Sequence, residues 1–414
     1  MKRNVLFAIS LAAILASCKN DEKKTGEEND NTTMQQNYPA GSFGYDLDFL
    51  SKRDSGLVVL GSADGDAQII VSPRYQAKVF TSSAEGLNGK SFGWVNYKAF
   101  DGPPDEHMNG YGGEDRLWLG PEGGVFSLYF KPGDQMEFAN WKTPAPIDTE
   151  AWSLVTSDAT SVSMSKDMNL TNYAGTELKI KANRVVALID PNGVNADLGI
   201  QLATGVKAVA FKTINSLTNN GDNAWDEKSG APCMWNLDMF APSEACTIVI
   251  PYNNDAAGKV ATTDYFGEIP QDRIIYKSGI LFFKADGKSR GKLGIPPGRV
   301  KNVAGSYDAT NNVLTIVKYD INPTGKYLNQ EWRTDREPFS GDAMNAYNDG
   351  PLADGGQMGP FYEIESVSPA AFLKPGETQT HNHNVYHFTG EKASLNEIAQ
   401  KVLGVSVEEI EKAF

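Results

Sequence analysis

From about residue 40 to residue 390, the chain alternates short runs of β-forming residues with turns rich in glycine, aspartate, asparagine and proline. These turn signals recur roughly every dozen residues, and convincing helical periodicity is absent until the C-terminus. The runs that read most clearly as strands are GLVVL, QIIVS, AKVFTSS, VFSLYF, ELKIKANRVVALID, KAVAFKTIN, CTIVIPY, GILFFKA and VLTIVKY. Such a pattern is typical of antiparallel sheets packed face to face. We therefore predict an all-β fold over residues 40–390, as one very large antiparallel sandwich or two stacked ones.

The last 24 residues, 391–414, have a different pattern. SLNEIAQKVLG and SVEEIEKAF each begin with Ser-x-x-Glu, at Ser394 with Glu397 and at Ser406 with Glu409. This spacing is the capping box of a helix N-terminus. We expect a short helical pair that packs against the sandwich.

The N-terminus, MKRNVLFAISLAAILASCKN, has a basic start, a short apolar run and then Leu-Ala-Ser-Cys. Residues 1–17 are therefore expected to be a secretory signal peptide. Ala-Ser-Cys resembles a bacterial lipobox, which would make Cys18 the lipidated first residue; cleavage without a lipid is the alternative. Residues 18–39 are polar and charged, and we expect a disordered tether. The acidic pair soon after Cys18 resembles the surface-export signal of Bacteroidetes-type lipoproteins, so we expect an outer-membrane lipoprotein facing the periplasm or the cell surface.

The formal charge of the full chain is −14, and removal of the signal peptide would make it −16. Such a surface repels phosphate backbones and anionic membranes. We expect no nucleic-acid partner, and contact with a membrane only through the lipid anchor. The two remaining cysteines, Cys233 and Cys246, are open to either interpretation, one disulfide or two buried thiols.

Three of the four histidines lie in one short stretch, PGETQTHNHNVYHF. On a strand, His381, His383, Val385 and His387 would point to the same side, because side chains alternate between the two faces.

Glu363 and Glu365, in FYEIES, likewise share a face of the preceding strand. A turn over residues 370–379 would make the two strands antiparallel neighbours. Opposite residues would then lie ~5 Å apart, so we expect Glu365 to contact His383. Such a pair suits general acid/base chemistry. The alternatives are a divalent metal held by His381, His383 and Glu365, or a solvated sheet face.

Three stretches together resemble the galactose-mutarotase-like superfamily, and within it an uncharacterised family of Bacteroidetes lipoproteins. They are GPFYEIESVSPAAFLKPGETQTHNHNVYHFTG, INSLTNNGDNAWDEKSGAPCMWNLDMFAPS and NGYGGEDRLWLGPEGGVFSLYF. The resemblance implies a supersandwich with a carbohydrate site on one concave sheet face and a general-base glutamate near Glu365. Aldose epimerases carry their catalytic histidine mid-chain, whereas here no histidine lies between His107 and His381. A plain aldose 1-epimerase is therefore not the expectation.

Several residues are candidates for holding a substrate. His107, Glu114 and Arg116 lie in a glycine-rich segment of the kind that lines pockets, and arginine binds a carboxylate bidentately. KADGKSRGKLGIPPGR forms a local basic run that suits uronic or sulfated sugars, or else a solvated hairpin. The remaining candidates are Arg290, Trp332, Asn348, Asp349 and His387.

The leading hypothesis is a lipid-anchored carbohydrate-active enzyme that abstracts a proton from a saccharide, which we expect to contain a uronic acid. Epimerisation, β-elimination and dehydration all begin this way. Glu365 would be the base with Glu363 in reserve, and His383 or His381 the acid. No cofactor is required, although a divalent metal fits one alternative, and the partner is an oligosaccharide or a monosaccharide. The rival hypothesis is a non-catalytic glycan-binding lipoprotein.

Overall fold

The computed structural model describes residues 37–414. The signal peptide over residues 1–17, Cys18 and nearly all of the expected tether lie outside the described residues, so those predictions stay predictions. The chain from Tyr38 to Phe414 forms one compact unit.

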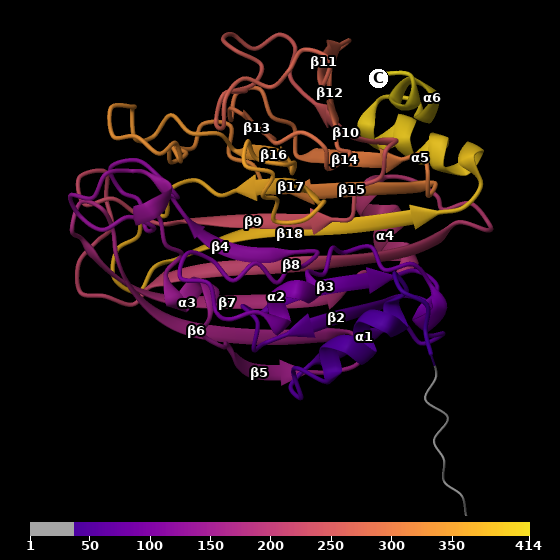
Figure 1. The fold of residues 1–414 in the computed structure, drawn as a ribbon, viewed down its shortest axis with the longest axis horizontal. Helices are drawn as coiled ribbons and strands as arrows, with labels where there is room; N and C mark the ends of the chain where they lie inside the picture. The colour runs from indigo at the N-terminus through magenta and orange to yellow at the C-terminus, as the bar shows by residue number, and fades with distance from the viewer. Residues whose placement is uncertain (1–36) are drawn as a thin grey trace, which may run out of the picture. The chain divides into compact units, whose positions relative to one another are not determined.

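Within this part of the chain the strands form three antiparallel sheets (Figure 1). The large sheet has ten strands in the order β11 (Ile274–Lys277), β12 (Ile280–Lys284), β10 (Cys246–Pro251), β14 (Val303–Asp308), β15 (Val313–Tyr319), β18 (Thr378–Thr389), β8 (Lys207–Asn219), β7 (Glu177–Leu188), β6 (Ser161–Thr171) and β5 (Ser153–Ser157). The small sheet has the order β13 (Gly291–Ile295), β16 (Met344–Asn348), β17 (Tyr362–Val367), β9 (Cys233–Phe240) and β4 (Arg116–Gly120). The N-terminal sheet consists of β1 (Val58–Gly61), β2 (Gln68–Ser72) and β3 (Lys78–Ser83). The predicted all-β architecture of large antiparallel sheets is confirmed.

Alternation along the strands explains why the sheets stack. In β7, Leu178, Ile180 and Ala182 are buried, while Lys179 and Lys181 between them are exposed. The buried set belongs to one extended core that also contains residues of the small sheet, including Met234 on β9. Burial of these apolar side chains is the main stabilising contribution to such a sandwich.

The run VFSLYF, residues 125–130, was expected to be a strand, and this prediction is wrong. Its backbone makes turns: the Ser127 N–H donates to Gly124 O and the Leu128 N–H to Pro121 O. Phe126 and Phe130 are nevertheless buried in the core. The hydrophobicity of the run therefore reflects burial without strand pairing.

The helices are short and lie at the margins of the sheets. Their bounds are α1 (Phe43–Ser51), α2 (Tyr97–Asp101), α3 (Ala145–Asp148), α4 (Pro191–Leu198), α5 (Lys392–Leu403) and α6 (Val407–Glu411), with single 3₁₀ turns η1 (Gly86–Asn88) and η2 (Phe138–Asn140). No helix in the described residues is both long and apolar enough to span a bilayer.

The C-terminal helices α5 and α6 pack on the outer face of the large sheet, near β14 and β10 (Figure 1). The capping box of α6 is present as predicted, with Ser406 and Glu409 bonding each other's backbone. The box predicted at Ser394 is wrong, because α5 begins earlier and has Glu391 as its N-cap. Ser394 therefore lies inside the first turn of the helix.

Strand β17 and strand β18 lie in different sheets, which contradicts the predicted pairing. β17 pairs with β16 and β9, whereas β18 pairs with β15 and β8. The segment between them crosses from the small sheet to the large sheet instead of closing a hairpin. The expected contact between Glu365 and His383 is therefore wrong.

The two cysteines of the described chain, Cys233 and Cys246, are both buried and unpaired. They lie on β9 and β10, which belong to different sheets.

Candidate functional site

A cavity of about 420 Å³ lies on the outer face of the small sheet, the face turned away from the large sheet. Its floor is made by alternate residues of the strands. They are Arg116 and Trp118 on β4, Trp235 and Met239 on β9, Lys292 on β13 and Glu363 on β17. The volume falls in the range typical of ligand pockets.

Residues 96–110, which comprise helix α2 and the loop after it, form one wall of the cavity, and the loop carries His107. A Gly-Gly pair connects this loop to β4. Gly112 has φ +81°, and a Cβ there would lie 2.2 Å from the carbonyl oxygen of Trp94. Only glycine fits this backbone position without a shift, so the pair fixes where the loop leaves the sheet.

Aromatic rings dominate the remaining wall and the rim. Phe138 stacks on His107 with ring centroids 4.4 Å apart, and Trp141 stacks on Trp332 with centroids 5.9 Å apart. Nδ1 of His107 lies 2.6 Å from the carbonyl oxygen of Trp141. Since a carbonyl oxygen can only accept, Nδ1 carries the proton, and Nε2 is the acceptor of the neutral ring.

The Glu363 carboxylate is the acidic group of the cavity floor. Arg116 Nη2 donates to its Oε1 over 2.6 Å, and both side chains are almost fully buried. Burial raises the pKa of Glu363 to about 8; Arg116 acts in the opposite direction, and Glu365 adds to the increase. A carboxyl group with such a pKa exchanges a proton near neutral pH, as a general base requires.

Glu365, two residues further along β17, lies beneath this floor and is fully buried. Its Oε2 accepts from Trp235 Nε1 over 2.7 Å and from Lys292 Nζ over 3.1 Å. Burial lowers the pKa of Lys292, but Glu365 and other carboxylates outweigh this effect, and the net pKa lies above the usual value. Glu365 therefore holds a charged lysine in place at the cavity.

Two further ionisable side chains line the cavity. Arg290 is exposed, and its guanidinium lies 3.9 Å from the centroid of the Phe266 ring. No carboxylate among the described residues forms an ion pair with Arg290 within 4 Å. Glu122 also lines the cavity, and burial raises its pKa.

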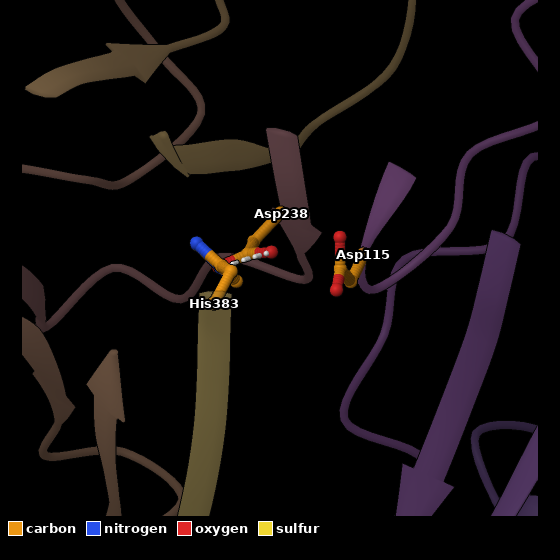
Figure 2. Close-up of side chains that lie close together, drawn as sticks. All are labelled: Asp115, Asp238 and His383. Atoms are coloured by element: carbon orange, nitrogen blue, oxygen red, sulfur yellow. Dashed lines mark hydrogen bonds and ion pairs between the residues drawn. The ribbon is translucent and has the colours of Figure 1, made fainter. Parts of the chain in front are cut away.

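The three histidines of β18 share one face, as predicted, and this face points into the closed space between the large sheet and the small sheet. His383 Nε2 lies 2.9 Å from Asp238 Oδ2, and His383 Nδ1 lies 2.8 Å from Ser366 Oγ (Figure 2 shows His383 against Asp238). Ser366 Oγ is also 2.8 Å from His381 Nε2. All of these side chains are buried.

The pKa shifts indicate which groups of this network carry a proton and therefore which of them donate hydrogen bonds. Burial lowers the pKa of His383, but Asp238 outweighs burial and the net pKa is raised, whereas burial lowers the pKa of His381 to about 3. A protonated His383 then donates to both Asp238 and Ser366, and Ser366 donates to the neutral His381. Asp, His and Ser are connected here as in a catalytic triad, yet no atom of the network lines the cavity over β17. The network therefore links the two sheets and does not meet a ligand in the cavity.

A metal site was one alternative, with His381, His383 and Glu365 as ligands. The structure does not bring this set together, because Glu365 faces the cavity side of the sheet. Within the described residues the group with suitable spacing is Asp115, Asp238 and His383, drawn in Figure 2. Asp115 already pairs with Arg184 over 3.1 Å. A cation would have to compete with that arginine, so the donor set fits a divalent metal poorly.

The other predicted binding residues divide into two groups. His107, Arg116, Arg290 and Trp332 line the cavity. The others do not: His387 Nε2 bonds Glu114 Oε1 over 3.0 Å, Asn348 holds the backbone at Gly287 and Ser289, and Asp349 accepts from the Tyr347 hydroxyl.

The sequence analysis missed several residues of the cavity. Trp118 and Trp235 were not singled out, Lys292 appeared only within a basic run, and Glu122 was not considered. One signal was available, because Arg116 and Trp118 are two apart on a strand and so share a face. Glu122 and Trp141 come from segments without regular structure, and no pattern places them.

The fold and the cavity together define a stacked β-sheet protein with an aromatic, charged pocket on its smaller sheet. The chain belongs to a family of unknown function (DUF6786), whose model matches residues 41–414. No curated protein matches the chain.

Solved structures with a similar chain path include three proteins from different organisms. The Slr1438 protein of Synechocystis sp. PCC 6803 is 13% identical at TM-score 0.49, with 81% of this chain and 96% of that chain covered. A galactose mutarotase related enzyme of Lactobacillus acidophilus is 9% identical at TM-score 0.46, with 80% and 97% covered. The aldose epimerase homologue of C. elegans is 13% identical at TM-score 0.43, with 81% and 99% covered. The residues of the cavity, not these similarities, support the function proposed below.

Proposed function

We propose that the protein is a carbohydrate-active enzyme that binds an acidic saccharide in this cavity and removes a proton from it with Glu363. The observation that carries the proposal is one carboxyl group with a pKa of about 8 on the floor of an aromatic cavity. Glu363 takes the role first given to Glu365, because Glu363 lines the cavity while Glu365 is bound to Trp235 and Lys292 beneath it.

The proposed substrate class follows from the lining of the cavity. Aromatic faces such as Trp118 and Trp332 pack against the apolar faces of sugar rings. Arg290 is a cation without an acidic partner among the described residues, so it is free to bind the carboxylate of a uronic sugar. A neutral sugar would leave this guanidinium without a counter-charge.

The proposed reaction begins with loss of the C5 proton of a uronic sugar. The proton goes to Glu363, and the electron pair of the C–H bond forms an enolate with the carboxylate group, which a cation such as Arg290 stabilises. Return of a proton to the opposite face gives the C5 epimer. Alternatively, the electron pair forms a C4–C5 double bond and the C4 oxygen leaves with the electrons of its bond, taking a proton from an acid.

His107 is the proposed acid, in place of His381 and His383. It is the histidine that lines the cavity, and its Nδ1 is fixed by the Trp141 carbonyl. Nε2 is then the atom that can carry a proton to a leaving group. Glu122 also lines the cavity, and burial raises its pKa, which favours the protonated form that an acid needs.

The experiment is a screen of the purified protein against uronic-acid-containing and neutral oligosaccharides, followed by absorbance near the unsaturated-uronate band and by mass spectrometry. We expect wild-type protein to convert an acidic saccharide and Glu363→Gln to bind it without conversion. Glu177→Gln, at an exposed site on β7, is the matched control and should behave as wild type. Conversion that persists in Glu363→Gln would contradict the assignment of the base. A chelator arm separates metal-dependent from metal-independent conversion.

A second candidate is a glycan-binding protein without catalysis, which the exposed aromatic rim of the cavity favours. Saccharides that raise the melting temperature while none is converted would support it over the enzyme.

We also propose that Cys18 anchors the protein to the outer membrane, on its periplasmic or surface face. The support is the lipobox-like sequence before Cys18 and the polar segment after it. In a bacterial host, wild-type protein should partition into the membrane fraction and Cys18→Ser should not; equal partitioning of both would contradict the anchor.

A further inference from the structure

We infer that the cavity takes one ring of an oligosaccharide, whose neighbouring rings lie on Phe138 and Phe266 at the mouth. The inference rests on the proposed assignment of the cavity to a sugar, and it specifies a chain of several rings as the ligand. It follows from the exposure, position and neighbours of these two aromatic residues.

Phe138 is exposed to 61% and yet lines the cavity. It lies in the 3₁₀ turn η2, and it is not part of the cores that pack the described sheets. Its ring stacks on His107 at 4.4 Å, which fixes the orientation of the ring. An exposed apolar ring held in a fixed orientation beside a pocket is a platform for a ligand.

Phe266 is a second such ring, exposed to 40% and also lining the cavity. The Arg290 guanidinium lies 3.9 Å from its centroid, so one position offers both an apolar face and a positive charge. The Phe266 and Tyr347 rings lie edge to face, with centroids 6.1 Å apart. Arg290 covers one face of the Phe266 ring, so the other face can pack against the neighbouring pyranose ring, while the guanidinium stays available for the carboxylate of the ring in the cavity.

The surroundings of these rings favour a saccharide over a protein or a lipid. Beside Phe138, the Glu106 carboxylate pairs with Lys142 over 2.7 Å, and Asp105 is exposed. Beside Phe266 lies the charged Arg290. An apolar partner would have to remove these charges from water, which is costly. A sugar ring presents an apolar face to the aromatic ring and hydroxyl groups to the charged neighbours.

The test measures affinity as a function of chain length. Isothermal titration calorimetry uses the Glu363→Gln protein, so that no turnover occurs, with galacturonic acid and its di-, tri- and tetramers, and with the matching series of glucose and its β-1,4 oligomers. The second substitution is Phe138→Ala, Phe266→Ala or the control Tyr276→Ala. Tyr276 is exposed to 44% on β11 and does not line the cavity.

In one of the two series we expect affinity to rise about tenfold from the monomer to the trimer, equivalent to about 1.4 kcal/mol. Phe138→Ala should remove most of this increase and leave the affinity for the monomer unchanged. Phe266→Ala should also remove most of the increase, and it should weaken binding of galacturonic acid itself because Arg290 packs on this ring. Tyr276→Ala should have no effect. Equal affinity for all chain lengths would overturn the inference, and so would an equal loss for monomer and trimer in Phe138→Ala. Absence of binding in both series would overturn it too. If wild-type protein converts a monosaccharide but affinity does not change with chain length, this inference is wrong while the proposed reaction is still supported.

Discussion

Burial and the neighbouring Arg116 shift the pKa of Glu363 in opposite directions. Burial raises the pKa, Arg116 lowers it, and the result is about 8 against an ordinary value of 4.5. The basic form of Glu363 therefore becomes the major form only above about pH 8. Loss of this proton is therefore expected to increase the catalytic rate and to decrease the stability of the folded state.

We predict that kcat/KM rises with pH through about 8, because the base must be deprotonated. A pH profile of initial rates checks this, and an activity that falls between pH 7 and 9 would contradict it.

The folded state binds the Glu363 proton more tightly than the unfolded chain does. Its contribution to the free energy of unfolding is therefore complete below pH 4.5 and is lost as the pH rises through about 8. Glu363→Gln should weaken this fall in stability, as measured by thermal melts at pH 5 and pH 9.

A second prediction concerns Arg290. Arg290→Gln should raise KM for an acidic saccharide about tenfold without a change in melting temperature, because the side chain is exposed and makes no ion pair with the described residues. Binding of a neutral saccharide should not change. Lys288→Gln is the matched control, since Lys288 lies two residues away and pairs with Glu244 outside the cavity. Equal effects of the two substitutions would indicate a general charge effect and not a specific contact.

The sequence predicted which residues share a face more reliably than it predicted what that face contacts. Glu363 and Glu365 do lie on one side of β17, and His381, His383 and His387 on one side of β18. Which glutamate borders the cavity depends on Trp235 and Lys292, which come from distant parts of the chain. Alternation is a local property and could be predicted, whereas burial of one carboxylate by remote side chains could not.

At the scale of elements, the largest error concerns the connection between β17 and β18. The sequence from about residue 370 to residue 379 contains proline and glycine and resembles a hairpin turn. In the structure it crosses between sheets, because β17 finds its partners in β9 and β16 and β18 in β8 and β15. Strand identity depends on local sequence, but the choice of partner depends on long-range contacts that no single segment encodes.

The contact between β18 and β9 gives a prediction about stability. His383 and Asp238 are fully buried and face each other across the two sheets. Asp238→Asn should lower the free energy of unfolding by about 3 to 5 kcal/mol, since it leaves the imidazolium without its counter-charge. Burial raises the pKa of Asp238 to about 7, and the pKa of His383 is raised because Asp238 outweighs burial. Both groups bind a proton more tightly in the folded state, so their contribution to stability is present at low pH and is lost as the pH rises through the folded-state pKa values. Denaturant unfolding should therefore show a smaller difference between variant and wild type at high pH; a constant difference would contradict the ion pair.

The C-terminal helices allow a matched comparison of two serines. Ser406 caps α6, whereas Ser394 lies inside α5 and its side chain makes no hydrogen bond with the described residues. Ser406→Ala should cost about 1 kcal/mol, while Ser394→Ala should change stability by no more than a few tenths. Chemical denaturation measures both, and similar losses would show that the α5 boundary is misplaced.

At the scale of the whole molecule, the net charge of −14 contrasts with the cavity, where Arg116, Lys292 and Arg290 gather. The fold class could be predicted from the strand pattern, because a long series of short β-strands can bury its apolar faces in only a few architectures. The cavity could not be predicted in the same way, because its walls come from very short helices and loops around residues 96–110, 138–141 and 332. Their positions depend on the completed sheet beneath them.

The central claim is that Glu363 removes a proton from a saccharide bound in this cavity. The most direct measurement is a proton NMR time course in D₂O of wild-type protein and Glu363→Gln with the same uronic saccharides. We predict that wild-type protein causes deuterium incorporation or loss of the C5 signal in one saccharide, and that Glu363→Gln binds this saccharide but leaves its spectrum unchanged. Exchange at an equal rate in both proteins, or no change with any saccharide that binds, would contradict the claim.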